Sequence, residues 1–123
     1  WVGMAAALYL IYRFVVTRDW RIAFVLTGLA VTYLPWLLYG ERTIFQFYTV
    51  VMIPFVALAL MLVAEHALGP RDGPPERRAG ATAAIAVFLA AAALISAFFY
   101  PVWTGMEIPY PFWVLHNWLS TWV

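Results

Sequence analysis

The sequence contains no cysteine and no lysine, and it carries little charge of either sign. The lack of cysteine excludes disulfide bonds, thiolate metal sites and cysteine nucleophiles. Seven basic residues, all arginines, and six acidic ones leave a net charge of +1. Because binding to a phosphate backbone needs clustered basic side chains, the scattered arginines argue against nucleic acid as a partner.

Apolar side chains are what the chain has in excess. Hydrophobic residues make up 66% of the 123 residues and charged residues only 11%, and the mean hydropathy is +0.86. A soluble domain is roughly half apolar, so the composition predicts an all-α integral membrane protein. The chain begins at Trp1, inside an apolar run and without a cleavable signal pattern. We therefore expect it to be the tail of a longer polytopic protein.

Four apolar runs predict four transmembrane helices, since a helix needs about 20 residues to cross the hydrocarbon. The runs lie at about 1–16, 22–39, 44–64 and 80–100. Prolines at 101, 109 and 111 are expected to end the fourth span, and 112–123 is predicted to be a short helix lying in the membrane interface. The polar face predicted for that helix carries His116, Asn117, Ser120 and Thr121.

The arginines are distributed unevenly between the two sides of these spans. Six of the seven, beginning with Arg13, fall near the connections at 17–21 and 65–79. The positive-inside rule makes that side cytoplasmic. The loop at 40–43 and the aromatic segment 101–123, with the C-terminus, would then lie on the outer face of the plasma membrane.

The loop at 40–43 contains an adjacent carboxylate and guanidinium, Glu41 and Arg42, among aromatic residues. Arg42 is a candidate ligand for a lipid-linked phosphate, helped by the positive end of a helix predicted to begin near Ile44. The alternative is an arginine that only anchors the helix at the interface. Gln46, four residues further on, would share the face of Arg42 and bond a phosphate or sugar oxygen, or else satisfy a polar contact between helices.

Aromatic residues around this loop form a candidate rim for a sugar or lipid. A membrane-interface belt is the alternative explanation for them. The members are Tyr33, Trp36, Tyr39 and Tyr48, with Trp103 in the later outer segment.

Two outer carboxylates, Glu41 and Glu107, are weak candidates for a general base, although Glu41 can equally be the surface partner of Arg42. His116 has no second ligand at helical spacing, so a solvated structural role is expected for it. Neither a metal nor a cofactor is expected.

Several motifs follow one another along the chain in a fairly specific order. They are Tyr33–Trp36, Arg42–Tyr48 with Pro54, Phe98–Pro101, Trp103–Gly105 and the ending Trp113–Trp122. In this combination the sequence resembles the C-terminal four-helix membrane region of the protein O-mannosyltransferases, particularly the actinobacterial ones. The resemblance covers essentially the whole chain, 1–123.

The resemblance implies part of a larger, many-spanning glycosyltransferase fold of the GT-C type. It implies that mannose moves from polyprenyl-phosphate mannose to Ser or Thr hydroxyls of exported proteins on the outer face of the membrane. Arg42 would stabilise the lipid phosphate as the glycosyl bond breaks. In the family the base is an acidic residue of the first outer loop, upstream of this region, so the segment alone is expected to be inactive.

Two other classes of protein stay open from the residues alone. One is a fragment of a transporter or lipid flippase in which Glu41 and Arg42 form a gating pair and Pro54 breaks a helix. The central parts of all four runs lack ionisable residues, which argues against it because coupling sites usually need such groups near the midplane. The other is a non-catalytic membrane scaffold.

Overall fold

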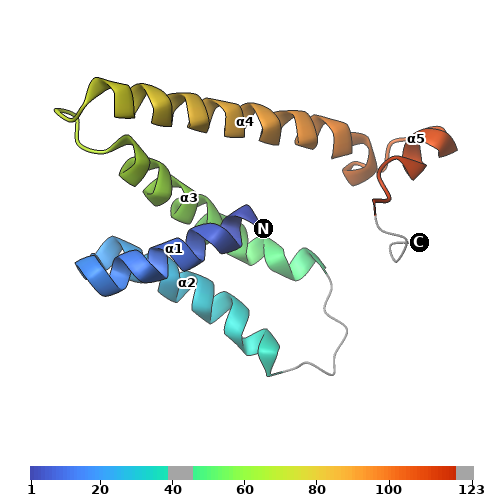
Figure 1. Cartoon of the computed structure of the whole chain (residues 1–123). Coiled ribbons are helices and arrows are strands. Elements are labelled where there is room, and N and C mark those ends of the chain that lie inside the picture. Colours follow the sequence, from blue (N-terminus) through green and yellow to red (C-terminus); the bar gives the residue numbers. More distant parts are fainter. Residues whose placement is uncertain (39–45, 119–123) are drawn as a thin grey trace. The chain divides into compact units, whose positions relative to one another are not determined.

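The computed structural model describes residues 1–38 and 46–118, and every regular element in these ranges is a helix (Figure 1). In chain order they are α1 (Val2–Thr17), α2 (Trp20–Leu37), the 3₁₀ helix η1 (Gln46–Met52), α3 (Ile53–Leu68), α4 (Pro75–Trp103) and α5 (Tyr110–Val114). They form two compact units, residues 1–81 and the residues from 82 onward. The predicted all-helical class is confirmed for the described residues.

A connection of only two residues turns α1 back into α2. Arg18 takes a left-handed conformation, with φ of 55°, and donates its backbone N–H to the carbonyl of Phe14. Asp19 then caps α2, because its carboxylate accepts the backbone N–H of Arg21 at 2.9 Å. Ending one helix and capping the next on adjacent residues produces a tight helical hairpin.

The third apolar run begins differently from the prediction. We expected a helix to start near Ile44, but within the described residues η1 occupies Gln46–Met52 and the α-helix starts at Ile53. Pro54 lies in the first turn of α3. Proline has no amide hydrogen to bond to the carbonyl four residues earlier and is favoured in the first helical turn, where that N–H would have no partner, so the start of the α-helix at Ile53 suits it.

The fourth run forms a longer helix than predicted. α4 continues through Pro101 to Trp103, so the prediction that Pro101 ends the helix is wrong. Gly105, with φ of 68°, ends it instead: its N–H bonds to the carbonyl of Val102, and the N–H of Met106 bonds to the carbonyl of Pro101. This is a Schellman motif, which uses the proline's free carbonyl and needs a residue without a Cβ at the left-handed position.

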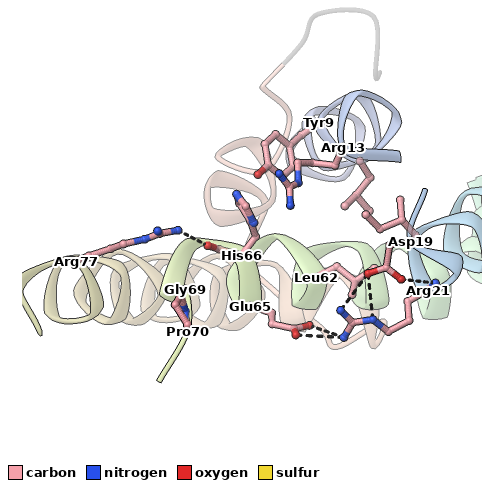
Figure 2. A pocket seen from close by; sticks show the side chains of 12 residues that line it. Tyr9, Arg13, Asp19, Arg21, Leu62, Glu65, His66, Gly69, Pro70 and Arg77 are labelled. Carbon is pink, nitrogen blue, oxygen red and sulfur yellow. Dashed lines mark hydrogen bonds and ion pairs between the residues drawn. The ribbon is translucent and has the colours of Figure 1, made fainter. Parts of the chain in front are cut away.

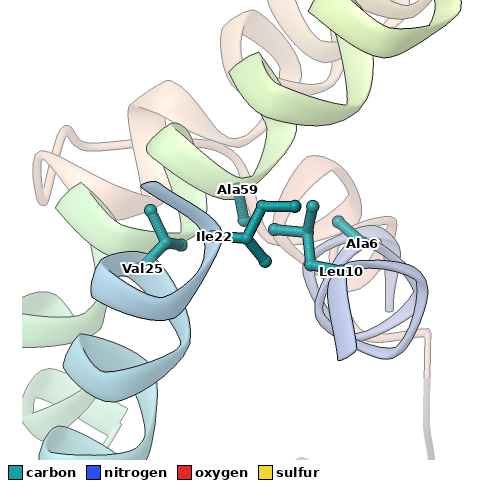
Figure 3. Close-up of a cluster of buried hydrophobic side chains, with 5 residues drawn as sticks. All are labelled: Ala6, Leu10, Ile22, Val25 and Ala59. Carbon is teal, nitrogen blue, oxygen red and sulfur yellow. The ribbon is translucent and has the colours of Figure 1, made fainter. Parts of the chain in front are cut away.

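Helices α1, α2 and α3 pack around a small core in the first unit (Figure 3). Its members are Ala6, Leu10, Ile22, Val25 and Ala59. Most other large apolar side chains are exposed, including Leu8 at 63% and Phe24 at 58%. Such exposure is expected of helices surrounded by lipid, where apolar side chains need no burial within the protein.

Within residues 1–38 and 46–118, three helical segments are long and apolar enough to cross a membrane: Trp20–Leu37, Thr49–Leu68 and Pro75–Trp103. They correspond to the second, third and fourth predicted spans. The first run forms α1, an apolar helix of 16 residues. That α1 is a fourth span stays a prediction.

Close approach of α2 and α3 depends on Gly28, because a Cβ at this position would overlap the ring of Phe55. We expect Gly28→Ala to lower the free energy of unfolding by about 1 to 3 kcal/mol, the usual cost of overpacking. Gly80→Ala is the matched control, since a Cβ at Gly80 meets nothing within 4 Å and alanine favours a helix. Thermal unfolding of both variants in detergent measures the difference. Equal melting temperatures would contradict close packing at Gly28.

Candidate functional site

Two connections that are far apart in sequence meet at one end of the first unit. The guanidinium of Arg21 lies 3.1 Å from a carboxylate oxygen of Glu65, near the end of α3, and 3.1 Å from Asp19. The ion pair places the α1–α2 connection beside the start of the α3–α4 connection. Assigning both arginine-bearing connections to one side of the membrane requires this arrangement.

Asp19 is held as a carboxylate by its neighbour. Side-chain hydrogen bonds from the Arg21 guanidinium, at 3.3 and 3.1 Å, and the bond from the Arg21 backbone N–H lower the pKa of Asp19 below its ordinary value. The cap of α2 and the ion pair therefore share one negative charge.

A cavity of about 330 Å³ opens at this end between α1, α3 and the first turn of α4 (Figure 2). Its polar lining residues are Tyr9, Arg13, Asp19, Arg21, Glu65, His66 and Arg77. Sequence reasoning assigned none of them to a site. The signal in the sequence was the recurrence of arginine next to acidic residues in both connections.

The predicted donor site belongs to the opposite end of α2. Tyr33 and Trp36 lie three residues apart on its last turns; Tyr33 is exposed at 51%, and Trp36 is half-buried. Tyr39, Glu41 and Arg42 lie outside the described residues, as do the side chains of Gln46 and Tyr48. The structure therefore describes the two helices that flank this loop, α2 before it and η1 after it.

Trp103 and Glu107 lie in the second unit. The ring of Trp103 is exposed at 66% and stacks on Phe99, with ring centroids 5.9 Å apart. Glu107 is exposed between the end of α4 and α5. No ion pair joins Glu107 to another described residue, and its candidacy as a base stays a prediction.

His116 departs from its predicted solvated role. Of the predicted helix over 112–123, the structure describes residues up to 118, and in this part the helix is the five-residue α5, followed by a turn at Leu115 and His116. The turn points the imidazole inward, with 4% of the residue exposed, while Leu115 is 59% exposed. Pro111 restricts the start of this helix, and the chain turns after a single helical turn, so that at Leu115 and His116 the apolar side chain is exposed and the polar one is buried, the opposite of the prediction.

Both imidazole nitrogens of His116 meet carbonyl oxygens. Nδ1 lies 2.7 Å from the carbonyl oxygen of Phe112, and Nε2 lies 2.8 Å from that of Phe98. The ring also stacks on Phe98 at a centroid distance of 4.1 Å. His116 thereby fastens α5 to the end of α4.

Replacing His116 with phenylalanine should release this connection. The variant keeps an aromatic ring but loses the contacts of both imidazole nitrogens with carbonyl oxygens, which should cost about 1 to 3 kcal/mol of stability. Limited proteolysis should then cut the chain between Gly105 and Tyr110 faster than in the parent protein. Glu107→Gln, an exposed change in the same segment, is the control. Unchanged cleavage in His116→Phe would show that the two hydrogen bonds do not secure α5.

No family model and no solved structure matches the chain. Among curated proteins it is 36% identical over 112 residues to the polyprenol-phosphate-mannose–protein mannosyltransferase of Mycolicibacterium smegmatis, covering 91% of this chain and 22% of that protein. It is 33% identical over 122 residues to the Mycobacterium tuberculosis protein of the same name, covering 99% of this chain and 23% of the relative. The chain thus spans less than a quarter of the length of these relatives.

The apolar helices and their lipid-type exposure define the chain as a helical membrane protein. More particularly, it is related to a segment of the polyprenol-phosphate-mannose–protein mannosyltransferases. This relationship confirms the resemblance inferred from the sequence motifs.

Proposed function

We propose that this chain is the C-terminal membrane part of an enzyme that transfers mannose from polyprenol-phosphate mannose to Ser or Thr hydroxyls of exported proteins. The observation that carries the proposal is the similarity, over 91% and 99% of the chain, to relatives with that activity in their names. These names favour the glycosyltransferase over a transporter or a scaffold.

In this proposal the segment binds the donor and does not supply the base. Negative charge builds on the lipid phosphate as the glycosyl bond breaks, and a fixed guanidinium in a water-poor site stabilises it. Arg42 takes this role, with Gln46 bonding a phosphate or sugar oxygen. Its placement in the connection that follows the apolar helix α2 supports a site at the membrane boundary.

The general base comes from a carboxylate upstream of this segment, in the first outer loop of the GT-C fold. The isolated chain is then inactive. The exposure of Glu107, with no charged partner among the described side chains, supports leaving it out of catalysis. Glu41 is assigned to Arg42 as its surface partner.

Replacing Arg42 in the full-length enzyme distinguishes a phosphate ligand from an interfacial anchor. Lysine keeps the charge and can still reach the interface, but it loses the planar fork that grips two phosphate oxygens. We expect Arg42→Lys to reduce mannose transfer about tenfold or more, since a charge-assisted hydrogen bond is worth about 1.5 to 3 kcal/mol. Arg42→Ala should be more severe. Transfer of radiolabelled mannose to a Ser/Thr-rich peptide is the measurement.

Arg71→Lys, the same change in the connection between α3 and α4, is the matched control and should leave transfer unchanged. Normal mannosylation by stably expressed Arg42→Ala enzyme would eliminate the phosphate role and leave Arg42 as an anchor.

The proposed orientation has its own test, and the lack of native cysteine in this segment helps it. A cysteine at Asp72, exposed in the α3–α4 connection, should resist an impermeant thiol reagent added to intact cells. A cysteine appended after Val123 should react, because the proposed C-terminus is outside the plasma membrane. The reverse labelling pattern would overturn the orientation and the outer donor site together.

A further inference from the structure

The cavity between α1, α3 and the start of α4 brings together two arginines, a histidine and a tyrosine that the proposed donor site does not use (Figure 2). α1 contributes Tyr9 and Arg13, α3 contributes His66, and α4 contributes Arg77. The rings of Tyr9 and His66 face one another with centroids 5.8 Å apart. At about 330 Å³ the cavity falls within the size range of small-ligand sites, roughly 300 to 1,000 Å³.

The arginines that line this cavity differ in what surrounds them. Arg21 is compensated by two carboxylates, Asp19 and Glu65. Arg77 instead donates to two backbone carbonyls at the end of α3, that of Ala67 at 3.1 Å and that of His66 at 2.7 Å. These bonds fix the position of the Arg77 guanidinium without neutralising its charge.

Arg13 forms no side-chain hydrogen bond or ion pair with any residue in the described part of the chain, although it is half-buried. The guanidinium groups of Arg13 and Arg77 both lie near enough to His66 to interact electrostatically with its imidazole. The imidazole nitrogens of His66 likewise have no hydrogen-bond partner among residues 1–38 and 46–118. Two uncompensated guanidinium groups and an imidazole therefore converge on one cavity, which favours an anion there.

We propose that this cavity binds a phosphate group, with Arg13 as its main ligand and Arg77 and His66 completing the site. Arginine presents a planar fork that matches two phosphate oxygens, and Arg13 has all its donors available. Because the cavity opens at the end of apolar helices, a phospholipid headgroup would reach it at the height of the bilayer surface. The site is independent of the donor loop, which follows the opposite end of α2.

The test uses the full-length enzyme in detergent and native mass spectrometry to measure binding. Dioctanoyl phosphatidic acid, inorganic phosphate and dioctanoyl glycerol are titrated separately. Arg13→Gln should weaken the binding of phosphatidic acid about tenfold or more, the effect of losing charge-assisted hydrogen bonds. The variant should fold, because the Arg13 side chain makes no internal hydrogen bond, and an unchanged melting temperature verifies this.

Arg18→Gln is the matched control. Arg18 lies at the same end of α1, but its guanidinium sits over the ring of Phe14 at 5.7 Å and does not line the cavity. We expect it to bind phosphatidic acid like the parent protein. Binding of inorganic phosphate with the same dependence on Arg13 would identify a free anion as sufficient, whereas binding of phosphatidic acid alone would identify a lipid headgroup; either supports the site.

Equal affinity of the Arg13→Gln and Arg18→Gln proteins for phosphatidic acid would overturn the proposal, as would equally tight binding of dioctanoyl glycerol, which has no phosphate. The Arg42→Ala enzyme should retain the Arg13-dependent binding. The test of the Arg13 cavity is therefore independent of the test of the Arg42 donor site.

Discussion

The arrangement of the first unit rests on Arg21, whose side chain joins the start of α2 to the end of α3. Its backbone N–H is capped by Asp19 at the start of α2, and its guanidinium bonds both Asp19 and Glu65 of α3. Since Arg18 and Asp19 alone separate α1 from α2, the same interaction also fixes the end of α1. The charges are exposed, so the ion pair contributes geometry more than stability. It sets which helix ends lie together and, with them, the position of the cavity.

Away from this polar end, α2 and α3 are held together by close van der Waals packing. Small residues let α2 and α3 approach, as Gly28 does beside Phe55, and the buried side chains are few. Lipid tails are as apolar as leucine, so helices in a bilayer gain little by burying large side chains against one another. A small apolar core, with the Arg21 ion pairs at one end of the helices, is therefore the arrangement expected in a bilayer.

The helical class and the apolar runs followed from composition and spacing, because about 20 apolar residues can cross a bilayer only as a helix. Helix ends were predicted less well. The end of α4 beyond Pro101 is fixed by a hydrogen bond from the Met106 N–H to the proline's carbonyl, and the inward turn of His116 depends on the carbonyls of Phe98 and Phe112. Both involve backbone groups, which sequence periodicity does not report. The cavity was missed for a related reason: Arg13 and Arg77 are far apart in sequence, and only the packing of α1 against α3 and the turn into α4 brings them together.

The length of α4 has a consequence for the height of the cavity. Its 29 residues span about 43 Å at 1.5 Å per residue, more than the roughly 30 Å of the hydrocarbon layer. Glu76, Arg77 and Arg78 occupy its first turn. A helix of this length can cross the hydrocarbon layer and still place its charged first turn, with Arg77, among the lipid headgroups.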